Sequence, residues 1–257
     1  MLDRASGELI SAEKYIVANW ASHVDMTTGR PVETSDSMFD DQPKVILPSP
    51  AGGHNWHPMA FNIDTGLVYI PTLDVPFHYS LDENFQYDTR TWNLGISTST
   101  LPDLLVEMPA PPSRGFLKAW DPVAQREVWS VEHPGAFNGG VLSTAGNLVF
   151  QGTSDGRFAA YAADSGDTLW ELPINIGIVA PPVTYSVWGD QYLAVLAGWG
   201  GGAIIGFDAG VTAASHYENF GRLFVFRLGA TAPLPPVPRK AKEFLPPSFG
   251  ADLTETQ

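Results

Sequence analysis

The stretch that decides the fold reads Lys118-Ala-Trp-Asp-Pro-Val-Ala-Gln-Arg-Glu-Val-Trp129. A second copy follows as Ala159-Ala-Tyr-Ala-Ala-Asp-Ser-Gly-Asp-Thr-Leu-Trp170. The copies lie 41 residues apart, so Ala119 aligns with Ala160, Asp121 with Ala162, Gln125 with Gly166 and Trp129 with Trp170. A period of about 40–45 residues is typical of a propeller blade built from four strands. The repeat therefore predicts an all-β chain of four-stranded antiparallel blades.

Each copy has the residues of a hairpin. In the full template, an extended segment reaches an Asp or Asn that caps a turn, glycine supplies a positive φ, and a second strand runs on to tryptophan; the first copy keeps the aspartate, Asp121, and the second keeps the glycine, Gly166. Asp3–Gly7 and Asn62–Gly66 match this turn more weakly, at spacings of 59 residues that indicate blades with insertions. We expect strands at Phe116–Trp120, Glu127–Val131, Asn147–Gln151, Arg157–Ala162, Thr168–Leu172, Gln191–Ala197 and Arg222–Leu228. Of these, the four from Asn147 to Ala197 are expected to form one blade.

The bulk composition excludes several classes of function. The formal net charge is −14, and a surface of that sign repels nucleic acid and anionic lipid, so neither is expected as a partner. Cysteine is absent, which excludes a disulfide, a thiolate metal site and a cysteine nucleophile within the sequence. No run reaches the roughly 18 apolar residues of a membrane-spanning helix, so no membrane span is expected.

Two segments depart from the strand pattern. Residues 72–113 form a long aromatic and polar insert without a clear period, which predicts a packed loop over an opening. Residues 231–257 are rich in proline and predict an extended linker or disordered tail. We therefore divide the chain into a propeller portion, residues 1–230, and a tail, residues 231–257.

Several segments, in order along the chain, resemble the pyrroloquinoline quinone (PQQ)-dependent, or quinoprotein, alcohol dehydrogenases. They are Leu2-Asp-Arg-Ala-Ser-Gly-Glu-Leu9, Gly53-His-Asn-Trp-His-Pro58, Gly139-Gly140 with Thr144–Gly156, and Ala197-Gly-Trp-Gly-Gly201. The two tryptophan repeats look like that family's tryptophan docking motifs, which join neighbouring blades. The resemblance covers residues 1–230. It is closest to the quinohaemoprotein branch, in which a proline-rich linker leads to a cytochrome domain.

The resemblance implies about half of an eight-bladed propeller, the C-terminal half, with PQQ near the axis beside Ca²⁺ or a similar cation. It implies a periplasmic enzyme that oxidises a small alcohol by hydride transfer to the quinone and passes electrons to a cytochrome c-type acceptor. In the family, the aspartate base, the cation ligands and a vicinal cysteine pair lie upstream of the matched region. We therefore expect no catalytic residue and no metal ligand in this chain, and a partner that is either the missing N-terminal half or another copy.

The same resemblance assigns cofactor-binding positions to Asn55, Trp56, Phe137 and Trp199. Asn55 matches a family asparagine whose amide points at the PQQ ring; the alternative is an asparagine that caps a backbone turn. Phe137 stands where relatives commonly carry tryptophan. Trp199 lies among glycines that permit close approach to the cofactor rim, or it is an ordinary packing tryptophan. His57 is expected to have a pocket or packing role and not to bind metal.

A second function class stays open beside the enzyme. Related repeats occur in scaffold propellers that bind other proteins, so the chain can also be interpreted as a non-catalytic β-propeller protein-binding module. An open blade edge tends to pair with another chain, which predicts self-association or docking for either class.

Overall fold

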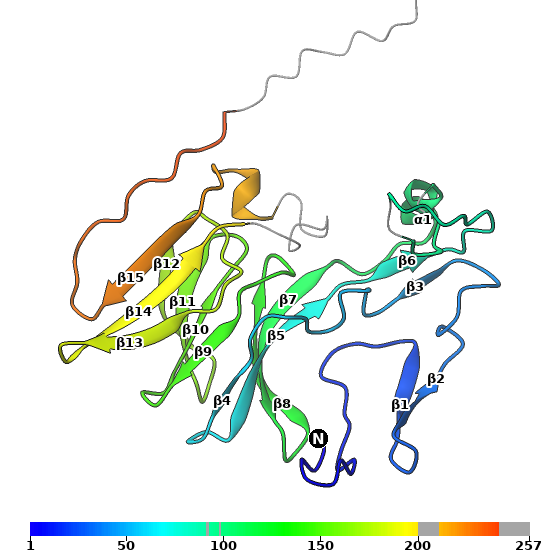
Figure 1. The fold of residues 1–257 in the computed structure, drawn as a ribbon, viewed down its shortest axis with the longest axis horizontal. Coiled ribbons are helices and arrows are strands. Elements are labelled where there is room, and N and C mark those ends of the chain that lie inside the picture. The colour runs from blue at the N-terminus through cyan, green and yellow to red at the C-terminus, as the bar shows by residue number, and fades with distance from the viewer. Residues whose placement is uncertain (91–92, 98, 200–210, 242–257) are drawn as a thin grey trace, which may run out of the picture.

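The computed structural model describes residues 1–90, 93–97, 99–199 and 211–241. Two four-stranded antiparallel sheets follow each other along the chain (Figure 1). The first has the order β4-β5-β7-β8 and the second the order β12-β11-β10-β9. Their strands are β4 (Ala60–Asn62), β5 (Leu67–Asp74), β7 (Arg114–Asp121), β8 (Arg126–His133), β9 (Val141–Thr144), β10 (Leu148–Gly152), β11 (Arg157–Ala162) and β12 (Thr168–Pro173).

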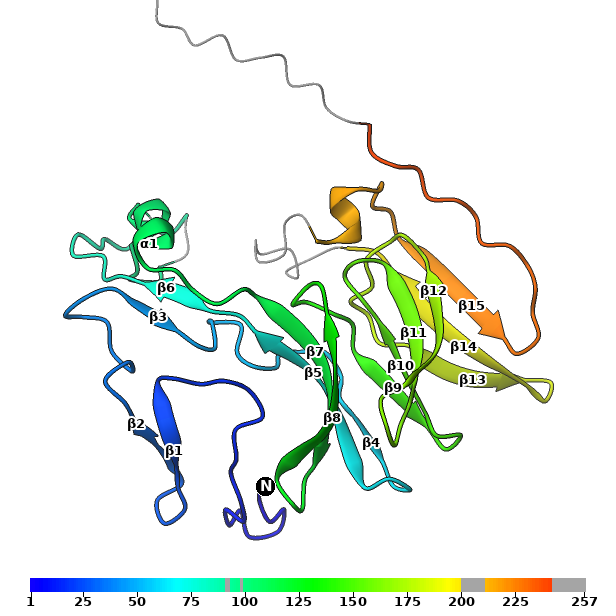
Figure 2. The same cartoon turned by 180° about the vertical axis from the view of Figure 1, so that it is seen from behind.

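A third sheet, with the order β13-β14-β15, completes a fan of three sheets, which is also seen from behind in Figure 2. It contains β13 (Val183–Val187), β14 (Asp190–Ala197) and β15 (Arg222–Arg227). Consecutive antiparallel strands that form laterally stacked sheets are the architecture of a propeller. The predicted fold class, a partial β-propeller of four-stranded blades, is confirmed.

The strand register confirms the repeat in detail. Ala119 pairs with Trp129 in the first sheet, and Ala160 pairs with Trp170 in the second. In both pairs the register shifts at the next residue, between Ala119 and Trp120 and between Ala160 and Tyr161. Two segments 41 residues apart therefore share an irregularity as well as a sequence pattern.

Two expectations about the blades are wrong. The fourth strand of the second sheet is β9, whereas β14 belongs to the third sheet. The segment between β12 and β13 contains Pro181 and Pro182, which have no backbone N–H to continue a ladder, so a new sheet begins after them. The turn Asn62–Gly66 joins β4 to β5 within the same sheet as β7 and β8, so its spacing of 59 is not a blade repeat.

The insert is more ordered than the lack of a period indicated. Within residues 72–113, β6 (Phe77–Tyr79) pairs with β3 (Lys44–Ile46), and α1 spans Leu101–Glu107. The remaining two-stranded sheet joins β1 (Ala21–Asp25) to β2 (Arg30–Glu33). Among the described residues, no helix is long and apolar enough to cross a membrane.

The predicted tail begins as an extended segment held against the third sheet. The Arg222 guanidinium donates to the carbonyl oxygens of Pro235 and Pro236 at 2.9 and 3.2 Å. Leu234 and Val237 pack against the apolar cluster shared by the second and third sheets. A boundary at residue 230 stays a prediction, and residues 242–257 lie outside the described part of the chain.

The junction between the first two sheets is made by one tryptophan. Trp129 on β8 donates its indole N–H to the carbonyl oxygen of Ala163, in the turn after β11, at 3.1 Å. Tyr69 on β5 donates its hydroxyl to the same oxygen at 2.8 Å. The Trp129 ring lies on Gly166, where an added Cβ would stand 2.7 Å from a ring carbon. Hydrogen bonds and ring contact thus fix the two sheets together.

We predict that Trp129→Ala lowers the free energy of unfolding by about 3–5 kcal/mol, the usual range for removing a buried aromatic ring. Urea denaturation followed by circular dichroism measures this change. The matched control is Trp188→Ala, because Trp188 is 100% exposed in the β13–β14 turn. Equal effects of the two substitutions would contradict the role of Trp129 as the joint between the sheets.

Candidate cofactor-facing site

The loop that carries Asn55 is fixed along β5 by backbone contacts. Ser49 N–H donates to Val75 O at 2.7 Å, and Leu73 N–H donates to Gly53 O at 2.9 Å. Gly53 permits the N-terminal segment to lie against this loop, because a Cβ there would stand 2.3 Å from Ile16 Cδ1. The loop therefore holds its shape between a strand and a second chain segment.

Asn55 is exposed and uses its side chain within the loop. Its amide nitrogen donates to Ala51 O at 2.8 Å, and its amide oxygen accepts from Trp56 N–H at 2.8 Å. These are the bonds expected of an asparagine that caps a turn. A primary amide has two N–H donors, so one remains for a second acceptor while the first fixes the orientation of the side chain.

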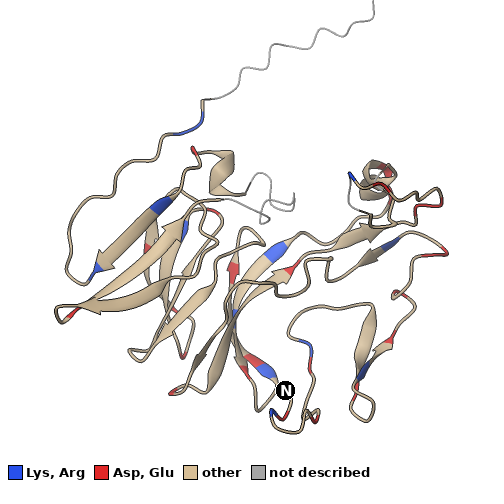
Figure 3. Ribbon diagram, viewed as in Figure 1, with Lys and Arg blue, Asp and Glu red and all other residues tan. Residues whose placement is uncertain are grey.

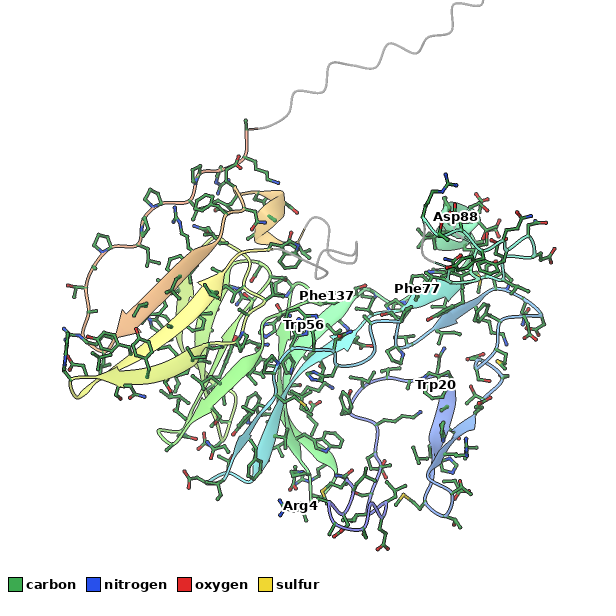
Figure 4. All side chains as sticks on the ribbon, in the orientation of Figure 1. Arg4, Trp20, Trp56, Phe77, Asp88 and Phe137 are labelled. Atoms are coloured by element: carbon green, nitrogen blue, oxygen red, sulfur yellow. The ribbon has the colours of Figure 1, made fainter. Side chains whose placement is uncertain are left out.

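Aromatic rings stack behind Asn55. Trp56 is 58% exposed, and its ring stacks on the His57 imidazole with centroids 4.3 Å apart and an interplanar angle of 22°. The centroid of the buried His57 ring lies 6.4 Å from the centroid of the Phe137 ring. Figure 4 labels Trp56 and Phe137 close together, where the first two sheets meet. Two predicted site residues are thus linked through His57, for which the sequence predicts a pocket or packing role.

Phe137 and Trp199 belong to one buried cluster with Leu73, Val75 and Ala136. Each is only 7% exposed. Trp199 is clamped by Asn219, whose amide oxygen accepts from Trp199 N–H at 2.8 Å. An added Cβ at Gly177 would stand 2.7 Å from a Trp199 ring carbon, so the indole packs closely against that backbone. The structure therefore groups all four predicted residues at one end of the sheets, with Asn55 and Trp56 accessible and the other two behind them.

A glycine pair ties this loop to the second sheet. Val141 N–H donates to Pro58 O at 3.0 Å, and a Cβ at Gly140 would stand 2.6 Å from Pro58 Cδ. Gln151 Nε2 donates to Gly139 O at 2.8 Å. The buried His133 lies behind it, with Nε2 and Gln151 Oε1 3.0 Å apart. Sequence reasoning missed this Gln151–His133 pair, because only tertiary contact shows that the two side chains meet.

His57 is the electrostatic anomaly of the site. Only 1% of the residue is exposed, and neither ring nitrogen has a hydrogen-bond partner. Burial, with a smaller contribution from His54, lowers the pKa of His57 from 6.5 to about 4. The ring is therefore neutral near pH 7 and behaves as a flat apolar spacer between Trp56 and Phe137.

Charged residues occur along the strands of the first sheet, as the blue and red segments of β5, β7 and β8 in Figure 3 show. Arg114 pairs with Asp74 at 3.2 Å, and Lys118 pairs with Glu127 at 2.8 Å. The described residues contain no group of three or more His, Cys, Asp or Glu placed to hold a metal ion. These carboxylates are thus engaged with cations of the protein.

Comparison with known proteins places the chain. A family model described as the β-propeller domain of glucose, ethanol and alcohol dehydrogenases, with PQQ in its name, matches residues 111–193. Quinohemoprotein alcohol dehydrogenase ADH IIB of Pseudomonas putida is 45% identical over 243 residues, which cover 94% of this chain and 34% of that protein. The chain is a homologue of one part of the quinohaemoprotein alcohol dehydrogenases. It spans about a third of the length of the relative that it matches.

Solved structures agree with this assignment. The crystal structure of quinohemoprotein alcohol dehydrogenase from Comamonas testosteroni has a TM-score of 0.79 and 39% identity, covering 91% of this chain and 35% of its own. A europium-containing methanol dehydrogenase has a TM-score of 0.73 and 28% identity, covering 88% of this chain and 42% of its own. The three-sheet fan therefore corresponds to part of a larger quinoprotein propeller.

We predict that His57→Phe flattens the pH dependence of stability. A histidine whose folded-state pKa is depressed binds its proton more readily in the unfolded chain, so stability is full above about pH 6.5 and declines as pH falls toward 4. Phenylalanine retains the stack and removes two unpaired nitrogens, so stability at pH 7 should be equal or higher. Urea denaturation at pH 7.5, 6 and 5 measures both effects.

Substitution of the exposed His23 by glutamine controls for the loss of one histidine. His133, whose pKa burial also lowers to about 4, remains in the variant and preserves part of the slope. An unchanged slope in His57→Phe would mean that His57 is not buried in its neutral form.

Proposed function

We propose that this chain forms part of a PQQ-dependent alcohol dehydrogenase and supplies one wall of its cofactor site. The observation that carries the proposal is the convergence of Asn55, Trp56, Phe137 and Trp199 at one end of adjacent sheets, in a chain homologous to quinohaemoprotein alcohol dehydrogenases over 94% of its length. When bound, PQQ supplies the acceptor for the hydride of the alcohol. The base and the ligands for Ca²⁺ or a similar cation come from polypeptide outside this chain.

The residues present fit a flat, polar-edged cofactor in two layers. Trp56 offers an exposed indole, which is the surface that a planar ring system stacks on. Asn55 offers a remaining N–H donor beside it, and an amide donor binds an oxygen more strongly as that oxygen gains charge. Phe137 and Trp199 are too buried to touch a ligand directly and instead hold the layer behind it. Asn55 thus orients the cofactor, and Trp56 excludes water from one side.

The partners follow from the same proposal. A small alcohol is the substrate, and electrons leave through a cytochrome c-type acceptor. The name of the relative, a quinohemoprotein, supports a haem in the electron path of that protein. The similarity to a europium-containing methanol dehydrogenase supports a metal ion in the whole protein. We propose a periplasmic location for the whole protein on the same ground of homology.

We predict that the chain alone binds PQQ weakly and oxidises no ethanol with PQQ, Ca²⁺ and an artificial electron acceptor. Quenching of tryptophan fluorescence measures binding, and dye reduction measures turnover. Asn55→Asp keeps the oxygen that accepts from Trp56 N–H and removes both amide donors. It should weaken PQQ binding roughly tenfold, the cost of one charge-assisted hydrogen bond.

Trp188→Phe, at the exposed turn, controls for general loss of fluorescence. Turnover by the chain alone would contradict the placement of the catalytic groups elsewhere. Equal PQQ binding by the parent and Asn55→Asp would contradict the role of Asn55. Failure to bind PQQ, even together with the remaining blades of the enzyme, would favour the protein-binding module.

A further inference from the structure

The turns of the two repeats carry different residues at one equivalent position, Gly166 in the second sheet and Gln125 in the first. In the second sheet, Gly166 is bare, and the Trp129 indole covers it while donating to Ala163 O. In the first sheet, the equivalent residues are Gln125 and Pro122, again 41 positions earlier. There, the side-chain amide of Gln125 donates to Pro122 O. In the second sheet, the turn carbonyl of Ala163 accepts an indole N–H from the neighbouring sheet. In the first sheet, the equivalent carbonyl of Pro122 accepts an amide N–H from a residue of the same turn.

Gln125 and a docked indole cannot occupy this turn together. A mere Cβ at Gly166 would stand 2.7 Å from the Trp129 ring, well inside van der Waals contact. Gln125 has a full side chain at the equivalent point and adopts a φ of +53°, a conformation that glycine enters without cost. The sequence therefore accepts backbone strain at a position where glycine would suit the turn better.

The other side of this junction carries the complementary change. Trp129 and Trp170 each stand eight residues after the first residue of their turn, Asp121 or Ala162. The N-terminal turn repeats the geometry of Asp121, because Asp3 Oδ1 accepts from Ala5 and Ser6 N–H at 2.9 and 2.8 Å. Eight residues after Asp3 stands Ser11, not tryptophan. Its hydroxyl oxygen is buried and has no hydrogen-bond partner.

The N-terminal segment lies across this same junction. Residues 14–17 line one cavity of about 490 Å³ together with Trp120, Gln125 and Glu127. At the second junction, the Trp129 ring fills the equivalent space over the turn. An unfilled volume and a glutamine over the acceptor carbonyl thus coincide at this turn. Ser11, which stands at the repeat position of a docking tryptophan, belongs to the segment that leads into residues 14–17.

We propose that the Gln125 side chain, which we call the plug, takes the place of a docking tryptophan at this turn. The plug makes this junction specific for an incoming segment with a small residue, here Ser11. The plug satisfies Pro122 O without an indole and blocks any blade that brings one. Its consequence is a looser junction than the Trp129 junction, since an amide covers far less apolar surface than a ring. The assignment concerns blade pairing and does not depend on the cofactor.

A double-mutant cycle between Ser11 and Gln125 tests the assignment on the whole chain, with the thermal unfolding midpoint as readout. Ser11→Trp alone should lower the midpoint by roughly 3–6 °C, because its indole meets the plug. Gln125→Gly alone should leave the midpoint unchanged or raise it by a few degrees, through relief of the positive φ. The double variant should lie above the sum of the single effects, because the indole then docks on a bare turn and donates to Pro122 O.

Two further variants keep the test decisive if Ser11→Trp does not fold. Gln125→Glu preserves the size and backbone cost of the plug but removes its N–H donor, so it should be less stable than Gln125→Gly. Gly166→Gln installs a plug at the occupied junction and should lower the midpoint by roughly 6 °C or more through loss of the Trp129 contact. Additive effects in the cycle, or equal midpoints for Gln125→Glu and the parent, would overturn the proposal.

Discussion

The carbonyl oxygen of Ala163 is the point on which the arrangement of the sheets depends. It accepts from Trp129 at 3.1 Å and from Tyr69 at 2.8 Å, so strands β8 and β5 of one sheet converge on a single turn of the next. A carbonyl oxygen has two lone pairs, and this one uses both. Because the donors sit on large buried rings, the bonds are shielded from water and the rings cannot leave without breaking them. Glycine at 166 is required for the close approach.

The candidate site inherits its geometry from that joint. The Asn55 loop lies beside β5, and the Tyr69 hydrogen bond holds β5 against the second sheet. Pro58 O also accepts from Val141 N–H at the start of the second sheet. Any rotation of one sheet against the other would therefore separate Trp56 and His57 from Phe137. Rigid sheets at a fixed angle suit a site that must hold a planar ligand without rearrangement.

The sequence was informative where chemistry is local. The repeat, its turn residues and its tryptophans predicted the β7–β8 and β11–β12 hairpins, one in each four-stranded sheet, since a capping side chain and a residue of positive φ act within a few positions. The grouping of strands was harder, because no strand was expected at β9 and only tertiary packing decides that β14 joins the third sheet. The turn Asp25–Gly29 escaped notice although Asp25 Oδ1 caps it at 2.7 Å, since no tryptophan follows at the repeat position. The site was reached through resemblance, and the role of His57 needed its burial.

Identical repeat positions also differ in burial for a reason that no local pattern contains. Trp129 and Trp170 align, yet 9% of the first and 39% of the second is exposed. Trp129 meets a turn with a bare glycine and a carbonyl that accepts its indole N–H, whereas the Trp170 ring packs edge-on against Phe158 and Phe226. The outer face of the third sheet is likewise apolar and exposed at Tyr185, Leu196 and Leu223. A propeller repeat specifies a pair of strands and a tryptophan ring, but the neighbouring sheet determines how much of that ring is buried. The free energy gained by burying the ring therefore depends on the junction between two sheets more than on either sheet alone.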